Sequence, residues 1–409
     1  MKIAIMGYGT VGSGVAEVID THEKSLAKST GGENMEVARI LDLRDFPGDK
    51  HEAALTKDFN DILNDKEIKV VAETMGGVNP AFDFTMKLLK AGKSVVTSNK
   101  ELVAQKGLEL LEAAKENGVN YLFEASVGGG IPIIRPLSQC FAANNIMGIA
   151  GILNGTTNFI LTKMIEDGMQ FDAALKLAQD LGFAERNPAA DIEGHDACRK
   201  ICILASLAFG KHVYPNFVHT EGITEITLED VKYAEAYNCV IKLIGRVKRL
   251  DDGKIDIIVA PMFVPNKSQL ANIDYEFNGI MVRGDCTGDV VFYGKGAGKL
   301  PTASAVVADV VDCCKHLKTR KFLFWADGNG DNILPYEESV TAMYIRANTT
   351  FELAQEVFGC IDKIEKADSP EGEIAFVTAQ LPYGEIIEKI AALESRGAKV
   401  ISKIRIGDL

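Results

Sequence analysis

The segment from Glu185 to Lys200 gathers carboxylates beside one lysine. Glu185, Asp191 and Asp196 supply the carboxylates, and Lys200 follows Asp196 by one helical turn, so these two side chains share a helix face. On an exposed helix such a pair is a surface ion pair that contributes only about 0.2–0.5 kcal/mol. The residues after Lys200 are mostly apolar, which favours a buried helix instead. Carboxylates around one lysine suit a zwitterionic substrate, because they can hold an ammonium group while the lysine exchanges a proton with a substrate oxygen.

A glycine motif opens the sequence directly after the apolar run Met1–Met6. Glycines at this spacing form a tight turn, let the backbone approach a pyrophosphate and allow a helix to pack on a strand. A tight turn without a ligand is the alternative, but the position between a strand and a helix favours a nicotinamide dinucleotide site. The residues expected at this cofactor are Gly7, Gly9, Thr10, Val11 and Gly12.

The group that reads the adenosine ribose should follow the second strand. Asp42 could accept a hydrogen bond from a ribose 2′-hydroxyl, and Arg44 could bind a 2′-phosphate. Residues 21–34 resemble an insertion, which makes the spacing from Gly12 longer than usual. The sequence therefore leaves both NAD and NADP as candidates.

Charge and composition argue against several other classes of protein. The 409 residues, 47% hydrophobic and 25% charged, suffice for two or three domains. A net charge of −13 without any Lys/Arg block argues against a nucleic-acid partner. No apolar run has membrane-spanning length and no signal peptide is evident, so we expect a cytoplasmic protein without a membrane partner. Scattered cysteines predict buried free thiols rather than disulfides, and the histidines have no transition-metal spacing.

Strand-like and helix-like segments alternate through the first 126 residues. This alternation predicts an α/β fold with a parallel, doubly wound sheet. Asn99 is the expected N-cap of one of the helices. The predicted strands are Met1–Met6, Val37–Leu43, Lys69–Glu73, Ser94–Ser98 and Tyr121–Ala125, and the predicted helices are Thr10–Ala27, Pro80–Ala91 and Glu101–Glu116.

The rest of the chain has a different pattern, typical of an α+β domain followed by a small module. A helix is predicted at Asp196–Phe209, strands at Ile255–Val264 and Val290–Tyr293, and a buried helix at Ala303–Cys313. From about Ser339 the order strand, helix, strand, strand, helix, strand predicts a ferredoxin-like module. The segments expected to form it are Val340–Ala347, Phe351–Phe358, Ile374–Leu381, Gly384–Ser395 and Lys399–Ile406, after a linker at Asp327–Asp331.

The carboxylate and lysine segment resembles the signature of the homoserine dehydrogenase family without a gap. The matching residues are Ala178, Gly182, Phe183, Ala184, Asn187, Pro188, Asp191, Gly194, Asp196 and Lys200. Further blocks agree with the family in the same order along residues 1–325. They are Glu73–Gly77, Ser98–Val103, Glu124–Pro132, Gly151–Asn158 and Gly296–Asp309.

The resemblance implies the reversible reduction of aspartate 4-semialdehyde to homoserine, a step toward threonine, methionine and isoleucine. Lys200 would act as the acid/base at the substrate oxygen, with Lys100 as the second candidate, and two nearby ammonium groups would lower each other's pKa. The residues implied for binding the amino-acid substrate are Glu185, Asp191, Asp196, Gly155 and Thr156.

The resemblance also implies further ligand contacts. Glu124, with the carbonyl groups of Val127, Gly129 and Ile131, would hold a monovalent cation, Na⁺ being the best fit to an all-oxygen site. A solvent-facing carboxylate at a strand end is the alternative for Glu124. Phe183 departs from the family, because many members carry an aromatic hydroxyl there. The additional cofactor contacts implied are Thr74, Met75, Ser98, Lys100 and Gly296.

The implied architecture has three parts and forms a homodimer or homotetramer. A discontinuous Rossmann domain (1–128 and 301–325) would flank a catalytic and dimerisation domain (129–300), followed by an ACT-type module (338–409). Amino-acid-sensing modules of this type usually carry a glycine in the turn that corresponds to Ala347–Glu352, which has none. We therefore expect weak or absent threonine inhibition and a module that serves assembly. Another amino-acid dehydrogenase is one alternative, and the Asp196 and Lys200 segment argues against it. A non-catalytic nucleotide sensor that signals through the C-terminal module is the other, and it would not need this segment intact.

Overall fold

The computed structural model describes residues 1–409, which divide into two compact units. The first unit contains residues 1–146, 202–215 and 292–329, and the second contains residues 147–201, 216–291 and 330–409. The two predicted dinucleotide-binding segments both fall in the first unit. The C-terminal residues 338–409 share the second unit with most of the segment 129–300.

The first unit is built on a parallel six-stranded sheet with the strand order β3-β2-β1-β4-β5-β6. This is the order of a dinucleotide-binding doubly wound sheet, so the predicted α/β class is confirmed for this unit. Ile3 to Met6 are fully buried, as expected for a strand covered by helices on both faces. The strands are β1 (Lys2–Met6), β2 (Glu36–Leu41), β3 (Leu55–Thr56), β4 (Ile68–Glu73), β5 (Ser94–Thr97) and β6 (Tyr121–Leu122).

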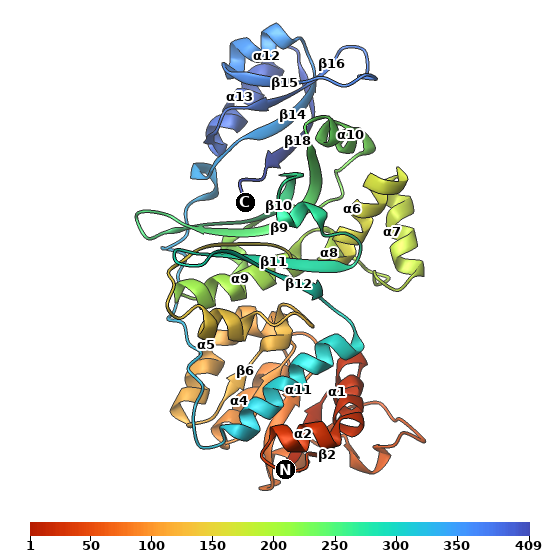
Figure 1. Ribbon diagram of the computed structural model, residues 1–409, viewed down its shortest axis with the longest axis vertical. Helices are drawn as coiled ribbons and strands as arrows, with labels where there is room; N and C mark the ends of the chain where they lie inside the picture. Colours follow the sequence, from red (N-terminus) through yellow and green to blue (C-terminus); the bar gives the residue numbers. More distant parts are fainter. The chain divides into compact units, whose positions relative to one another are not determined.

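Helices of the first unit pack closely on the sheet and on one another. A Cβ atom on Gly14 would lie 3.0 Å from the Cβ of Ala303, so the glycine lets α1 approach α11, beside which it runs in Figure 1. Asn99 is the N-cap of α5, as predicted, because its side chain accepts a hydrogen bond from Leu102 N at 3.1 Å. The helices are α1 (Thr10–Thr21), α2 (Glu23–Ser29), α3 (Asn60–Leu63), α4 (Ala81–Lys90), α5 (Lys100–Glu116) and α11 (Lys299–Lys315).

Some predicted boundaries in this unit are wrong for physical reasons. The predicted helix Thr10–Ala27 is two helices, α1 and α2, that break at His22. The predicted strand Tyr121–Ala125 ends at Leu122, and a 3-10 turn, Glu124–Ser126, follows. Here the backbone N–H of Glu124 bonds to the carboxylate of Asp309 at 2.8 Å, which draws the chain away from the edge of the sheet.

The second unit is built on a mixed sheet, in which β9 (Cys239–Arg249) and β10 (Ile255–Pro265) form a long antiparallel pair (Figure 1). The sheet order is β12-β11-β7-β9-β10-β18-β14-β16-β15, with β8 on β10. The other strands are β7 (Ile146–Ile152), β8 (His219–Thr220), β11 (Phe277–Gly284) and β12 (Gly288–Lys295). The helices are α6 (Gly155–Asp167), α7 (Phe171–Asp180), α8 (Ala189–Ile192), α10 (Leu228–Ala236) and α9 (His195–Phe209), which continues from this unit into the first.

The C-terminal residues form the predicted order of a ferredoxin-like module, and its sheet is continuous with that of the second unit. Its four strands have the order β18-β14-β16-β15, and β18 also pairs in parallel with β10, where Arg405 is opposite Met262. The elements are β14 (Met343–Asn348), α12 (Phe351–Phe358), β15 (Ile361–Ile364), β16 (Glu373–Thr378), α13 (Tyr383–Ser395) and β18 (Lys399–Ile406), and a short ribbon pairs β13 (Val340–Thr341) with β17 (Leu381–Pro382).

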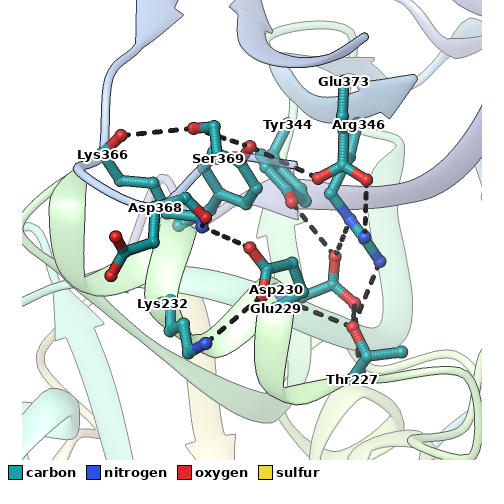
Figure 2. A network of polar contacts seen from close by, with 11 residues as sticks. Thr227, Glu229, Asp230, Lys232, Tyr344, Arg346, Lys366, Asp368, Ser369 and Glu373 are labelled. Atoms are coloured by element: carbon teal, nitrogen blue, oxygen red, sulfur yellow. Dashed lines mark hydrogen bonds and ion pairs between the residues drawn. The ribbon is translucent and has the colours of Figure 1, made fainter. Parts of the chain in front are cut away.

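A buried polar network joins this module to α10 (Figure 2). Arg346 and Tyr344, both on β14, reach the carboxylate of Asp230 on α10, each at 3.0 Å. Arg346 also contacts Glu373 on β16 at 3.2 Å. Asp230 is fully buried, so its charge depends on these partners.

Most of the expectations for the cysteines agree with the structure. All eight cysteines are free, so the prediction of no disulfides is confirmed. The expectation that the thiols are buried holds for Cys198, Cys202, Cys239 and Cys313, and it is wrong for Cys140, Cys286 and Cys360, which are exposed. None of the helices combines the length and apolar character needed to cross a bilayer.

Candidate active site

Asn154, at the start of α6, organises the carboxylates of the second unit. Its Oδ1 accepts a hydrogen bond from Thr157 N at 2.9 Å and so caps the helix. Its amide nitrogen donates to Asp191 Oδ1 at 2.7 Å and to Asp196 Oδ2 at 2.9 Å. Sequence reasoning did not single out Asn154, although an asparagine before two threonines at a helix start is a recognisable capping signal.

Lys200 and Asp196 form a buried ion pair on α9. Lys200 Nζ lies 2.8 Å from Asp196 Oδ2 and donates to the carbonyl oxygen of Leu153 at 2.7 Å. Asp196 is 3% exposed and Lys200 is 6% exposed, which excludes the surface ion pair as an explanation. A buried ammonium held by one carboxylate and one carbonyl group has a fixed position, as an acid/base group requires.

The first turn of α6 is closely packed on its surroundings. A Cβ atom on Gly155 would lie 2.6 Å from the carbonyl oxygen of Glu276, so the helix can begin here only without a side chain. Thr156 Oγ1 donates to the carbonyl oxygen of Phe183 at 2.6 Å. The ring of Phe183 packs on Phe159 at 4.8 Å between centroids, and it offers no hydroxyl group to a ligand.

Glu185 is not brought into this cluster. Its side chain is exposed in the turn after α7, and no hydrogen bond or ion pair joins it to Asp191, Asp196 or Lys200. The structure therefore assembles two of the three predicted carboxylates with Lys200. Lys100, the second candidate acid/base, belongs to the first unit, where it is the first residue of α5.

The glycine motif in the first unit has the geometry of a dinucleotide-binding turn. Gly7 has φ +88°, a conformation that favours glycine. A Cβ atom on Gly12 would lie 1.9 Å from the carbonyl oxygen of Gly7 and 2.8 Å from Thr74 Oγ1. Gly9 precedes Thr10, the first residue of α1, and no side chain caps the helix start. The backbone N–H groups of this turn, including that of Val11, can therefore donate hydrogen bonds to an anion such as a pyrophosphate.

Asp42 and Arg44 form a two-point ion pair beside this turn. Arg44 Nε and Nη2 lie 3.0 Å and 2.9 Å from the two carboxylate oxygens of Asp42, and Tyr8 N donates to the same carboxylate at 2.7 Å. The hydrogen bonds from Arg44 hold the pKa of Asp42 well below its usual range. Asp42 is thus firmly ionised and already paired, whereas the Arg44 side chain is 61% exposed.

The strand ends of β4 and β5 supply the other predicted cofactor residues. Thr74 Oγ1 donates to the carbonyl oxygen of Gly7 at 2.7 Å, and Met75 lies 3.0 Å from where a Gly7 side chain would be. Ser98 N bonds to the carbonyl oxygen of Glu73 at 3.3 Å. Glu73 itself is fully buried, and burial raises its pKa to about 7.

The loop expected to hold a cation is compact, but the Glu124 side chain has another role. Its carboxylate accepts backbone hydrogen bonds from residues 133, 134 and 135 at 2.6–2.9 Å and is 3% exposed, so a solvent-facing position is wrong. Gly129 has φ +56°, and a Cβ atom there would lie 2.3 Å from the carbonyl oxygen of Gly296. A cation here would rely on main-chain oxygens, such as those of Val127 and Ile131, more than on this carboxylate.

A Rossmann-type sheet with a glycine turn, together with a buried lysine and carboxylate cluster, defines a nicotinamide-dependent oxidoreductase. Comparisons with known proteins give the particular family. A model of homoserine dehydrogenase matches residues 132–311, and a model of the homoserine dehydrogenase NAD-binding domain matches residues 7–124. The chain belongs to the homoserine dehydrogenase family and is an NAD(P)-dependent oxidoreductase.

Relatives and solved structures support this assignment over the whole chain. The homoserine dehydrogenase of Neisseria gonorrhoeae is 37% identical, with 100% of this chain and 99% of the relative covered. That of Bacillus subtilis is 41% identical over 78% of this chain and 74% of the relative. A crystal structure of a homoserine dehydrogenase from Thiobacillus denitrificans has a TM-score of 0.90 at 36% identity, covering 100% and 98% of the two chains. A hyperthermophilic archaeal homoserine dehydrogenase in complex with NADPH has a TM-score of 0.64 at 27% identity, covering 76% and 97%.

Proposed function

We propose that the cluster at the head of α6 is where this homoserine dehydrogenase interconverts aspartate 4-semialdehyde and homoserine. The observation that carries this assignment is Asn154, which ties Asp191 and Asp196 together while Asp196 holds Lys200. Two carboxylates can bind the substrate ammonium group, and the neighbouring lysine can exchange a proton with the substrate's aldehyde or hydroxyl oxygen. Gly155 and Thr156 complete this group with backbone N–H groups, which have no partner within the helix in its first turn.

Lys200 acts as the general acid in the reducing direction. The nicotinamide supplies the hydride to the aldehyde carbon when it is bound, and Lys200 Nζ gives a proton to the aldehyde oxygen, which becomes the hydroxyl group of homoserine. In the reverse direction Lys200 takes that proton back. Lys100 is the second candidate for this acid/base role, and Glu185 binds the amino acid only if its exposed turn moves toward the cluster.

The cofactor binds at the glycine turn and contacts Thr74 and Met75 after β4, as well as Ser98 and Gly296. NADP is the favoured cofactor, because the Asp42 carboxylate already accepts from four donors while Arg44 is exposed and can meet a 2′-phosphate. The archaeal relative in complex with NADPH is consistent with this preference.

The remaining assignments concern the cation, the module and assembly. The carbonyl oxygens of the loop from Glu124 to Ile131 hold Na⁺, with the Glu124 carboxylate serving the backbone amides that follow. The ferredoxin-like module is of the ACT type and serves assembly of a cytoplasmic homodimer or homotetramer. The domain plan expected from the resemblance, 1–128 with 301–325, 129–300 and 338–409, remains our proposal for how the functions divide.

The direct test is a steady-state assay with purified protein. We expect homoserine to reduce NADP⁺ and NAD⁺, with the larger kcat/KM for NADP⁺. Turnover of a different amino alcohol, with none of homoserine, would contradict the proposed substrate. Cofactor binding without any turnover would instead favour a nucleotide sensor.

A further inference from the structure

A buried network of hydrogen bonds joins the ends of β4 and β5 in the first unit. The two strands are parallel neighbours, and Glu73 is opposite Thr97 in their register. Glu73, Thr97 and Asn99 are all buried. The proposed cofactor contacts at residues 74–75 follow Glu73 directly, and Ser98 lies between Thr97 and Asn99. The network therefore involves the immediate neighbours of the cofactor contacts on both strands.

The hydroxyl group of Thr97 links the two strand ends. It donates to Glu73 Oε2 at 2.5 Å and accepts from the backbone N–H of Asn99 at 2.9 Å. The other carboxylate oxygen of Glu73 accepts from the backbone N–H of Met75 at 2.8 Å. One hydroxyl group thus connects the carboxylate that fixes the segment after β4 with the backbone at the start of α5.

The side chain of Asn99 makes a second link between the same two segments. Its Nδ2 donates to the carbonyl oxygen of Gly77 at 2.7 Å, while its Oδ1 caps α5 by accepting from Leu102 N. Lys100 is the first residue of α5, directly after Asn99. The start of this helix is therefore tied to the loop after β4 by the Thr97 hydroxyl group and by the Asn99 amide group.

The loop after β4 is also tied to the glycine turn. Thr74 N donates to the carbonyl oxygen of Met6 at 2.8 Å, and Thr74 Oγ1 donates to the carbonyl oxygen of Gly7 at 2.7 Å. A continuous chain of hydrogen bonds therefore runs from the glycine turn, through Glu73 and Thr97, to the start of α5. These are the three segments at which the cofactor is proposed to bind.

The alternative is that these hydrogen bonds only stabilise the fold. However, β4 and β5 are already joined through the backbone along the whole of Ser94–Thr97. A buried threonine of this unit also does not need such partners, because Thr85 on α4 is fully buried and its hydroxyl group has no hydrogen-bond partner. The bonds of Glu73 and Asn99 reach past the strand ends instead, which is where a ligand is held in a doubly wound fold.

We propose that Glu73, Thr97 and Asn99 are positioning residues for the nicotinamide cofactor. They hold the segment after β4 and the start of α5 at a fixed separation, so that Met75 and Ser98 contact one cofactor molecule at the same time. The three side chains act through the backbone groups that they bind, and this preorganised spacing lowers the cost of ordering the two segments around the cofactor. The inference rests on the proposed function, because it assumes that both segments contact the cofactor.

The test is a fluorescence titration of the full-length enzyme with NADPH in the absence of substrate. Thr97→Val keeps the shape of the side chain and removes the hydroxyl group, so the dissociation constant for NADPH should rise by about tenfold. Thr97→Ser restores the hydroxyl group and should bind NADPH almost as tightly as the wild type. Thr85→Val removes a buried hydroxyl group that has no partner, and as the matched control it should bind NADPH normally.

Asn99→Ser tests the second link and keeps the proposal testable if Thr97→Val does not fold. Serine can still cap α5, but it lacks the amide donor to the Gly77 carbonyl oxygen, so the dissociation constant for NADPH should rise by about threefold or more. Asn117→Ser is its matched control, since it removes an amide donor to the Ala113 carbonyl oxygen at the other end of α5. This control should leave NADPH binding unchanged.

Kinetics separates positioning from a mere loss of stability. Thr97→Val should raise the KM for NADP⁺ by a similar factor and change the KM for homoserine little, because Asp191 and Asp196 belong to the other unit. Normal NADPH affinity in both Thr97→Val and Asn99→Ser, whatever their unfolding free energies, would overturn the proposal. Equal weakening by Thr85→Val would overturn it as well. A wild-type enzyme that does not turn over homoserine would contradict the proposed substrate and leave the titration valid as a test of the positioning residues.

Discussion

The carboxylate of Asp230 and the guanidinium of Arg346 form a buried ion pair, with 3.0 Å between Asp230 Oδ1 and Arg346 Nε (Figure 2). One residue lies on α10 and the other on β14, so the pair joins the C-terminal module to the rest of the second unit. Tyr344 and Thr227 complete the hydrogen bonds of the Asp230 carboxylate. The buried charges of Asp230 and Arg346 therefore each have several hydrogen-bonding partners within the protein.

Replacing Arg346 by methionine should destabilise the second unit strongly. The change leaves Asp230 buried without its cation, which typically costs about 3–5 kcal/mol of unfolding free energy. Denaturant unfolding measures the effect. Arg396→Met, which removes an exposed pair with Glu356, is the control and should change stability little. Equal effects of the two substitutions would show that burial of the Asp230 pair does not matter.

Lys200→Ala should lower kcat by about 10²–10⁴ while cofactor binding stays nearly unchanged, because acid/base groups contribute rate enhancements of this size. Steady-state kinetics and a nicotinamide binding titration measure the two effects. Lys176→Ala is the matched control, since Lys176 pairs with Asp180 at the same helical spacing but on the surface. A loss of less than tenfold in the Lys200 variant would transfer the acid/base role to Lys100 or to water. Asp196→Ala should mainly raise KM for homoserine.

Arg44→Gln should weaken NADP much more than NAD. A guanidinium on a phosphate contributes about 1.5–3 kcal/mol, so the KM for NADP should rise by about tenfold or more. Lys50→Ala removes another exposed cation of the first unit, paired with Asp20, and should leave both cofactors unaffected. If Arg44→Gln weakened NAD and NADP equally, Arg44 would not contact the 2′-phosphate, and Asp42 would be the group that selects the cofactor.

Glu73 should make the stability of the first unit depend on pH. Its pKa rises from 4.5 to about 7 on burial, so the folded state favours the protonated carboxyl. The stabilisation is complete below pH 4.5 and is lost as pH rises through about 7, by an amount of about 3 kcal/mol. Glu73→Gln cannot ionise and should flatten the stability profile in this window. Glu116→Gln, exposed at the end of α5, should retain the wild-type profile, and a Glu73 variant that does the same would disprove the assignment.

Threonine should inhibit weakly or not at all. The turn Ala347–Glu352 lacks glycine, and the Thr350 side chain already caps α12 by accepting from Leu353 N at 3.2 Å. Titrating threonine during turnover measures inhibition directly. Strong, cooperative inhibition that is lost when Asn348 is changed to alanine would show that the missing glycine does not matter.

The parts of the fold that were predictable are those with a clear local signal. The β1 strand, the glycine turn and the α5 cap each combine an apolar run with a turn or capping residue. The long strand β9 went unpredicted, because Lys242 and Arg246 interrupt its apolar pattern. Both are buried and paired with distant carboxylates, Asp274 and Asp408, which no local window contains.

The candidate site was predictable to a similar extent. Asp191, Asp196 and Lys200 were found because they lie in one short segment with helical spacing. Asn154 was missed as the residue that joins them, since its two aspartate partners are far along the chain. Glu185 was expected in the cluster because of its nearness in sequence, but the turn after α7 leaves it exposed.

The position of β18 has a consequence for how the protein is made. It follows every other strand along the chain, yet it lies in the interior of the sheet, between β10 and β14. The sheet of the second unit therefore cannot close until synthesis has passed Ile406, and until then the edge of β10 at Met262 and Phe263, beyond its pairing with β8, has no partner strand. Such an edge pairs readily with other chains, so a nascent or prematurely ended chain is prone to aggregate. A chain that ends before β18 therefore leaves the second unit without an interior strand of its sheet.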